Sequence, residues 1–352
     1  MTEQEDPMAQ EWQIDGPKVL DVGSEDEVVR QLRVGIVGGR LDVVTHDDSP
    51  AARLEVHEVV GRPLQVTWDG STLKVAHVKE ADGSLWEGLL QIGKDASNLR
   101  ARISLSIPST ALVRASTVSA DALITGVRNE AKVNTVSGVV TLDDIIGDVD
   151  ANTVSGEIEC HALKGDFTGN SVSGCLTVLA SDLQDINLNT VSGDIALDLA
   201  DGEAKISSNS VSGDVTVRVP QGRGYDVRAQ SVSGQVIVDG TSYSPKEDFK
   251  REMAAFKQEM AAMKDELKTA LKGHKKAAKQ AAKGGWAAPP PPEPPRPPHP
   301  PTPPRSGGRL RDGDGALQIR AVSVSGDVIV LRADADPAAH GSAPATSDRS
   351  GG

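Results

Sequence analysis

The chain repeats a four-residue motif, Thr or Ser followed by Val-Ser-Gly, at a spacing of about 20 residues. Successive motif glycines are 18, 18, 19, 20 and 21 residues apart, and the last copy follows after a jump of 92 residues. These glycines are Gly138, Gly156, Gly174, Gly193, Gly213, Gly234 and Gly326. A repeat of this length with strand-forming residues in every copy is typical of β-coils that stack on one another. The chain is therefore predicted to be all-β, a β-solenoid with coils of about 18–21 residues.

Alternation of apolar and polar residues predicts which side chains point inward. In the second full copy, Val154, Ile158 and Cys160 share one parity and are expected in the core, whereas the Thr and Ser of the motif fall on the other. The run 147–151 also alternates, but its parity does not carry through to Val154. A corner of the coil is therefore expected near Asn152.

An asparagine recurs two residues before the valine of the motif. Such asparagines are Asn134, Asn152, Asn170, Asn189 and Asn209. Gln230 takes the next place in the sequence. Coils that stack at roughly 4.8 Å would place these amides above one another, where they can hydrogen-bond along the axis. A structural ladder of amides is therefore predicted.

The outward hydroxyl rows and the acidic residues after the motif glycine suggest two functional alternatives. Rows of Ser and Thr either keep a face hydrated or bind ordered water or sugars. Glu157, Asp194 and Asp214 each follow a motif glycine, and neighbouring carboxylates can serve acid–base chemistry. Cys175 interrupts this acidic row, and no phosphate loop, nucleophile elbow or zinc spacing occurs in the sequence. We therefore expect no enzyme, no catalytic residues, no metal and no cofactor, with a parallel β-helix carbohydrate-active enzyme as the alternative.

Composition restricts the partners and the core. Aromatic residues make up only 3% of the chain, so Val, Ile, Leu and Ala must fill a narrow interior. The net charge of −13 disfavours nucleic acid as a partner. The sequence has no long apolar run, and the acidic residues 1–6 do not resemble a signal peptide, so a cytoplasmic location is expected. Two cysteines, Cys160 and Cys175, form no disulfide framework.

Units such as Asn-Thr-Val-Ser-Gly-Asp-Ile at residues 189–195 resemble the bacterial β-strand-repeat family labelled "putative adhesin", a domain of unknown function. The resemblance covers roughly residues 100–240 and the last copy near 309–333. It implies a surface-binding protein, and some members are associated with cell-envelope stress. It implies no catalytic residues.

The remaining segments divide the chain. Residues 1–108 are expected to form an irregular β cap or first coils, with turns at Gly38-Gly39 and Asp69-Gly70. The solenoid repeats occupy 109–243, a final coil 309–335 and a disordered tail 336–352. Between the repeats, 244–308 is predicted to be an inserted helix–polyproline hairpin, a helix to about Lys283 followed by a proline-rich run.

The expected helix carries an apolar heptad seam that could bind a protein. The seam residues are Phe249, Met253, Phe256, Met260, Met263 and Leu267. The seam could join two copies into a homo-oligomer, lie on the solenoid of the same chain or capture a protein partner. Lysines in the last turns make an anionic membrane surface a further alternative. The function expected is a non-enzymatic scaffold or binding protein acting through the repeat surface and 245–283. A glycan-binding or envelope-directed solenoid is the alternative.

Overall fold

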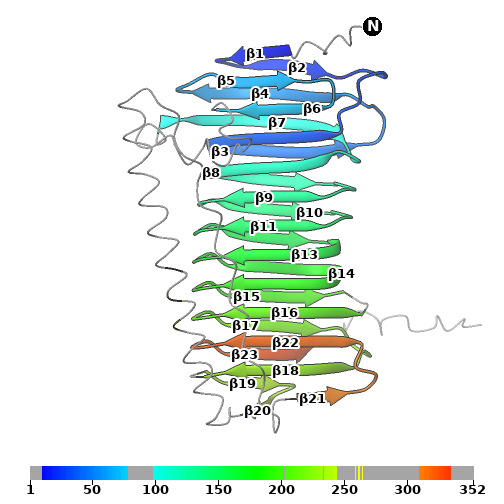
Figure 1. The fold of residues 1–352 in the computed structure, drawn as a ribbon, viewed down its shortest axis with the longest axis vertical. Helices are drawn as coiled ribbons and strands as arrows, with labels where there is room; N and C mark the ends of the chain where they lie inside the picture. The colour runs from blue at the N-terminus through cyan, green and yellow to red at the C-terminus, as the bar shows by residue number, and fades with distance from the viewer. Residues whose placement is uncertain are drawn as a thin grey trace, which may run out of the picture.

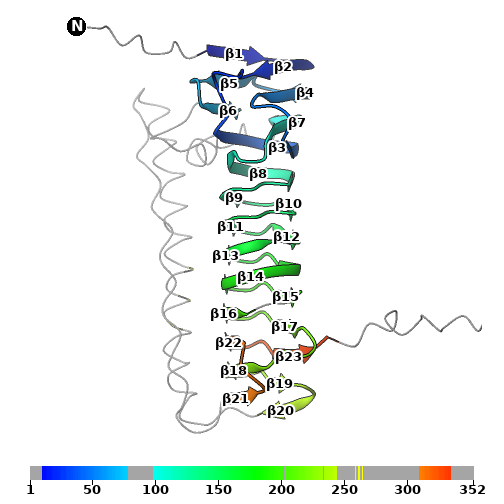
Figure 2. The same ribbon diagram turned by 90° about the vertical axis from the view of Figure 1, so that its right-hand side faces the viewer.

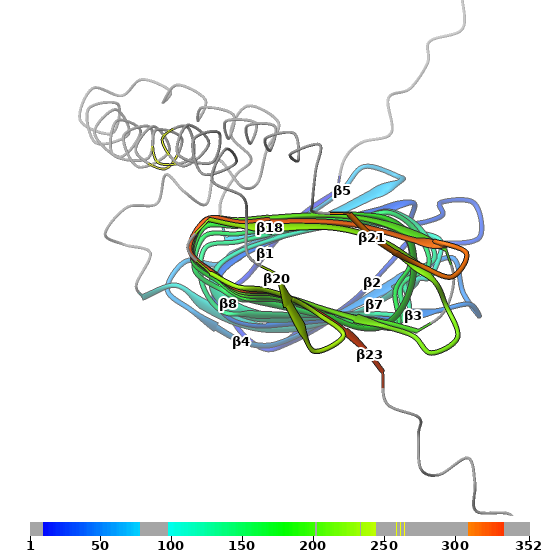
Figure 3. The same ribbon diagram turned by 90° about the horizontal axis from the view of Figure 1, so that it is seen from below.

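The computed structural model describes residues 10–77, 98–200, 203–232, 234–243 and 309–333, together with three helical residues, Gln258, Ala261 and Lys264. The predicted seam, the proline-rich run and the tail 336–352 lie outside the described residues. The described part is a β-solenoid drawn out into a long, flattened rod, which confirms the predicted all-β class (Figures 1 and 3).

Each coil contributes one strand to each of two broad faces (Figure 3). The first face is formed by strands that end at the Thr or Ser of the motif: part of β8 (Leu112–Thr125), β9 (Ala131–Thr135), β11 (Val149–Thr153), β13 (Lys164–Ser171), the end of β14 (Leu176–Thr190), β16 (Ala204–Ser210), β18 (Tyr225–Ser231) and β22 (Leu317–Ser323). The second face is formed by strands that follow the motif glycine: the end of β8, β10 (Val139–Asp143), β12 (Glu157–His161), the start of β14, β15 (Ile195–Leu199), β17 (Val215–Val219), β19 (Val236–Val238) and β23 (Val328–Arg332). Neighbouring strands on each face are parallel.

One continuous core of small aliphatic side chains runs through the rod. Among the described residues, Phe167 is the largest fully buried side chain, and it stands two residues before Gly169 on β13. The adjacent strand β14 has Ile186 and Leu188 in the paired positions. A large residue beside a glycine thus fills the same width as two medium residues, which keeps neighbouring coils the same size.

The corner of the coil lies two residues after Asn152, close to where it was expected, but the predicted parity of the motif residues is wrong. β11 runs through Asn152 to Thr153, and the chain bends at 154–156. Thr153 is buried and Val154 is partly exposed, the reverse of the predicted parity. The alternation of β11 continues to Thr153 because its hydroxyl finds hydrogen-bond partners inside the coil, at Gly156.

The N-terminal strands cap one end of the rod (Figure 2). They are β1 (Gln10–Ile14), β2 (Lys18–Val22), β3 (Gln31–His46), β4 (Ala52–Val60), β5 (Leu64–Trp68), β6 (Thr72–Ala76) and β7 (Arg100–Pro108). Four antiparallel pairings, β1–β5, β2–β4, β4–β7 and β5–β6, build the cap, and β3 pairs in parallel with β8. The Asp69-Gly70 turn is confirmed between β5 and β6.

Gly38-Gly39, predicted as a hairpin or coil turn, forms no hairpin, because both residues lie inside the long strand β3, where they pair with Ser119 and Ala120 at a corner of the next coil. Gly39 has a φ of +108°, and a Cβ there would lie 2.0 Å from the carbonyl oxygen of Ala101. The glycine therefore permits a close approach between β3 and β7 where the two strands pair.

The last coil in the sequence is not the last coil in space. β22 pairs with β16 on one side and β18 on the other, and β23 likewise lies between β17 and β19. The coil of β18 and β19 therefore forms the end of the rod, where β20 (Thr241–Tyr243) and β21 (Arg309–Asp312) cover its outer edges in antiparallel pairings (Figure 1). The expected final coil is thus an insertion between two coils that are consecutive in sequence. Sequence order alone does not reveal this, because every coil offers the same parallel edges.

Candidate functional site

Six motif corners are closed by a buried hydroxyl that bonds the motif glycine. Thr153 Oγ1 accepts a hydrogen bond from the N–H of Gly156 at 2.8 Å and donates to the carbonyl of the same residue at 3.1 Å. Ser171 forms the same pair with Gly174. Further motif hydroxyls accept the glycine N–H in the same way: those of Thr190, Ser210, Ser231 and Ser323. These hydroxyls point inward, so the expectation that the first Thr or Ser of the motif faces outward is wrong. The second serine of the motif, as at Ser155 and Ser173, is exposed as expected.

The motif glycines form a column in which successive backbones touch. A Cβ at Gly174 would lie 1.7 Å from the carbonyl oxygen of Gly156, and one at Gly193 would lie 1.8 Å from that of Gly174. Neither glycine has a positive φ. They are required by close stacking of the corners, since any side chain would collide with the coil beneath.

The motif valines form an outward stripe along this corner, which we call the valine edge. It consists of Val118, Val136, Val154, Val172, Val191, Val211, Val324 and Val232, in spatial order. The first four are partly exposed, whereas Val191, Val211 and Val324 are only 6%, 8% and 2% exposed. These three form a small apolar cluster, separate from the core, together with Val322 and Val232. Of the motif serines next to them, Ser155, Ser173, Ser192 and Ser212 are exposed.

One described residue of the insertion contacts this edge. Lys264, which is helical, places Nζ 3.5 Å from Oγ of Ser192. Ser192 follows Val191 directly, at the start of the buried part of the valine edge. The contact brings a residue from within the predicted seam segment to the apolar cluster.

The predicted asparagines are hydrogen-bonded in series on the first face. Each Nδ2 donates to the Oδ1 of the preceding coil, at 3.2, 2.9, 3.0 and 2.9 Å from Asn152, Asn170, Asn189 and Asn209 respectively. Gln230 does not continue the ladder in space, contrary to expectation, because Val322 of the inserted coil lies between it and Asn209.

Asn170→Ala is expected to lower the free energy of unfolding by about 2 kcal/mol, because it leaves Oδ1 of Asn152 and Nδ2 of Asn189 without their ladder partners. Asn187→Ala is the matched control, since Asn187 is exposed on the same face, and its effect should stay within about 0.5 kcal/mol. Chemical denaturation followed by circular dichroism measures both. Equal effects of the two substitutions would contradict a stabilising ladder.

Two of the three carboxylates considered for acid–base chemistry hold the backbone of the next coil. Asp194 Oδ1 accepts the N–H of Asp214 at 2.9 Å, and Asp214 Oδ1 accepts the N–H of Asp327 at 2.7 Å. Asp327 in turn accepts the N–H of Gln235. Asp327 was missed as a member of this row because it is 113 residues from Asp214 in the sequence. Glu157 is exposed two coils away from Asp194.

The row of Asp194, Asp214 and Asp327 has a structural role, since each carboxylate binds a backbone N–H of the next coil. Among the residues that the structure describes, no group of three or more His, Cys, Asp or Glu side chains is arranged to hold a metal ion.

Burial raises the pKa of the Cys160 thiol far above its ordinary value, so this cysteine is a core residue that stays protonated. Cys175 is partly exposed, and neither cysteine is in a disulfide.

Comparison with known proteins identifies one family over part of the chain. No curated protein matches the sequence. In the described residues, no helix is both long and apolar enough to cross a membrane. A solved structure named "putative lipid binding protein" from Parabacteroides distasonis is similar with 18% identity and a TM-score of 0.41, over 63% of this chain and 86% of that one. Another, named "putative cell adhesion protein" from Clostridium sporogenes, has 10% identity and a TM-score of 0.26, over 90% of this chain and all of that one. Residues 170–265, from the end of β13 to just beyond Lys264, match the model of the family Toastrack DUF4097, a domain of unknown function.

Proposed function

We propose that the protein is a non-enzymatic binding or scaffolding solenoid whose valine edge holds an amphipathic helix. The observation that carries this proposal is the valine edge itself: one outward valine per coil, in eight successive coils, beside a row of exposed serines. An apolar stripe of this kind on a polar rod is typical of an interaction surface.

The spacing of the valine edge suits a heptad seam. Coils rise by roughly 4.8 Å each along the rod. Seam residues that alternate steps of three and four rise by about 5 Å on average along a helix. A helix parallel to the rod can therefore place successive seam residues against successive valines, which is the helix-in-groove mode of recognition.

The occupant that we propose is the chain's own segment 245–283. The contact of Lys264 with Ser192 supports it, because Lys264 directly follows the seam residue Met263. The low exposure of Val191, Val211 and Val324, compared with the partly exposed valines of the earlier coils, supports the same position. In this arrangement the seam lies on the solenoid of its own chain and joins neither a second copy nor another protein.

A charge on the valine edge tests this proposal. Val211→Glu is expected to release the segment, because a carboxylate would have to be buried among Val191, Val322 and Val324. Tryptic cleavage at Lys264 in the folded protein should then become at least about tenfold faster, which corresponds to a loss of about 1.4 kcal/mol of docking free energy. Met263→Glu should have the same effect from the other side.

Val136→Glu is the matched control, since it introduces the same charge on the same edge, in an earlier coil where the valine is already partly exposed. Cleavage at Lys264 in this variant should equal that of the unmodified protein. If Val211→Glu and Val136→Glu are cleaved at the same rate while both retain their β-sheet circular dichroism, the segment does not dock on this edge.

The alternatives have less support. A sugar-binding hydroxyl face would need rows of available hydroxyls at the surface, but Thr153 and Ser171 use theirs inside the corner, and the exposed Ser155 donates its hydroxyl to the carbonyl of Val136. A carbohydrate-active enzyme would need an available carboxylate pair, but Asp194 and Asp214 each accept a hydrogen bond from the backbone of the next coil.

A further inference from the structure

The coil formed by β22 and β23 occupies a slot that two other coils create. We call the coil slot the space bounded by β16 and β17 on one side and by β18 and β19 on the other. The two bounding coils are joined directly through residues 220–224, whereas the inserted coil is reached only through residues 244–308, a connection of 65 residues. The strands at the two ends of this connection, β20 and β21, lie at the same end of the rod (Figures 1 and 2). A far shorter connection would join them within one molecule.

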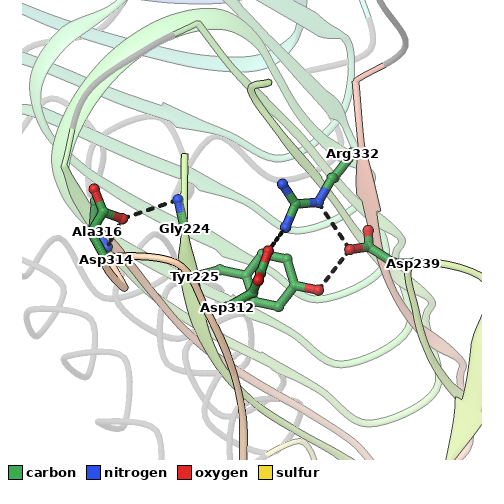
Figure 4. A network of polar contacts seen from close by, with 7 residues as sticks. All are labelled: Gly224, Tyr225, Asp239, Asp312, Asp314, Ala316 and Arg332. Atoms are coloured by element: carbon green, nitrogen blue, oxygen red, sulfur yellow. Dashed lines mark hydrogen bonds and ion pairs between the residues drawn. The ribbon is translucent and has the colours of Figure 1, made fainter. Parts of the chain in front are cut away.

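The inserted segment holds the end coil from both sides. β21 pairs antiparallel with the outer edge of β18, and β22 pairs in parallel with its inner edge. The turn between them is fastened by Asp314, whose Oδ1 accepts the N–H groups of Gly224 and Ala316 (Figure 4). β18 therefore lies between β21 and β22, two strands of the inserted segment.

A polar network at the end of the rod completes this attachment (Figure 4). Arg332 of β23 binds Asp239 through Nε at 3.0 Å, pairs with Asp312, and lies over the ring of Tyr225 with Cζ 5.1 Å from its centre. The hydroxyl of Tyr225 donates a hydrogen bond to Oδ2 of Asp239, with 2.6 Å between the two oxygens. The hydrogen bond to Asp239 raises the pKa of Arg332, which favours its positively charged form. The same contacts would form if Arg309–Ala333 came from a second copy of the chain.

The amide ladder shows a mismatch at the slot. Oδ1 of Asn209 is buried and has no hydrogen-bond partner among the described residues. The side-chain atoms Oε1 and Nε2 of Gln230 are also buried and also lack a partner there. Val322 lies between them, in the position where every earlier coil down to β9 has an asparagine. If the inserted coil were absent, Gln230 would stack on Asn209 and could donate the hydrogen bond that Oδ1 lacks.

The two bounding coils match each other along their whole length. Leu317 pairs with both Ala204 and Tyr225, and Ser323 pairs with both Ser210 and Ser231, so the two outer strands share one register. On the second face, Ile329 stands between Thr216 and Ile237. If the slot closed, each residue of one bounding coil would therefore stack on the equivalent residue of the other. The motif glycines of the two coils would stack in the same way.

From these observations we infer that the coil slot is a docking site for Arg309–Ala333 of a second copy of this chain. The slot closes by direct stacking of Gln230 on Asn209 when its own coil leaves. A released coil exposes Leu317, Ile319, Val328 and Val330, which are at most 1% exposed in the structure, and the slot of another copy is the surface that buries them equally well. Exchange of an identical element is a low-cost route to oligomers, because no new interface has to evolve.

Disulfide trapping between full-length chains tests this exchange. In a background carrying Cys175→Ser, one chain carries Thr216→Cys and a second chain Ile329→Cys; these positions are outward-facing partners on β17 and β23. After the two folded proteins are mixed and oxidised, we expect a disulfide-linked heterodimer at twice the 36.8 kDa of one chain. Its yield should rise with concentration and with time of incubation.

The matched control is a mixture of Thr141→Cys and Glu159→Cys chains, which are outward partners on β10 and β12 of two coils that are consecutive in the chain. The heterodimer from Thr216→Cys and Ile329→Cys should exceed this control at least about tenfold. A yield no greater than that of the control overturns the exchange.

Closure of the slot has its own test within one chain. Thr216→Cys with Ile237→Cys places two thiols a full coil apart, about 9.6 Å between backbones, which no disulfide can span while β23 lies between them. Formation of this intramolecular disulfide, more slowly than that of Thr216→Cys with Ile329→Cys, is expected if the slot closes. If it never forms, closure of the slot is wrong. Both readouts are independent of docking on the valine edge.

Discussion

Gly174→Ala is expected to lower the free energy of unfolding by about 4 kcal/mol or more, the range of the most disruptive single substitutions. The added Cβ would lie 1.7 Å from the carbonyl oxygen of Gly156, roughly half the separation of non-bonded atoms in contact. Relief requires the two corners to separate. The corner N–H of Gly174 is bonded to Ser171, so separation also strains that hydrogen bond. Denaturant titration followed by circular dichroism and intrinsic fluorescence measures the loss.

Two controls isolate the close approach in this prediction. Gly16→Ala replaces a glycine that has no positive φ and nothing within 4 Å of a Cβ, and it should change stability by no more than about 0.5 kcal/mol. Ser173→Ala removes an exposed side chain next to Gly174 and should be equally mild. If Gly174→Ala is as mild as these two, the corners do not stack as closely as the structure shows.

Phe167→Ala is the second substitution with a large expected effect, a loss of about 3–5 kcal/mol. Phe167 is fully buried in the middle of the rod, and Gly169 beside it can offer no side chain to fill the space left behind. Phe167→Leu keeps most of the volume and should cost less than about 1.5 kcal/mol. Denaturation midpoints of the two variants, measured on the full chain, give the comparison.

The order of these two Phe167 variants is the diagnostic result. A cavity predicts that Ala is much worse than Leu, whereas a requirement for the aromatic ring predicts that both are equally harmful. Equal losses would therefore contradict volume filling as the role of Phe167. Because a solenoid coil contacts only its neighbours, hydrogen exchange should show the loss of protection centred on β11, β13 and β14.

The sequence predicted the stacking but not the direction of the motif residues. Asn152 and Asn170 keep their phase only if coils stack in register, so the periodicity alone was enough to expect the ladder. The parity rule failed at Thr153 and Val154, because it assumes that a hydroxyl prefers water. Thr153 satisfies its hydroxyl with the backbone of Gly156, which allows Val154 to face outward.

The coil slot could not have been found from the sequence, and neither could the acidic neighbour Asp327. Parallel strands of equal length and equal pattern offer the same hydrogen bonds to any neighbour, so local sequence does not say which coil stacks on which. The substitution of Val322 for the asparagine of the repeat was the one available signal, and it became informative only once its position next to Asn209 was known.

The sequence by itself determined that this chain is a β-solenoid, how long each coil is, and where its amides and glycines recur, because period and strand chemistry are local properties. Only the tertiary structure decided that the first hydroxyl of each motif points in, that the valines form an outer edge, and that Leu317–Arg332 enters between two earlier coils. Those features depend on contacts between residues as much as 113 positions apart, where geometry and packing select among pairings that the sequence leaves equivalent.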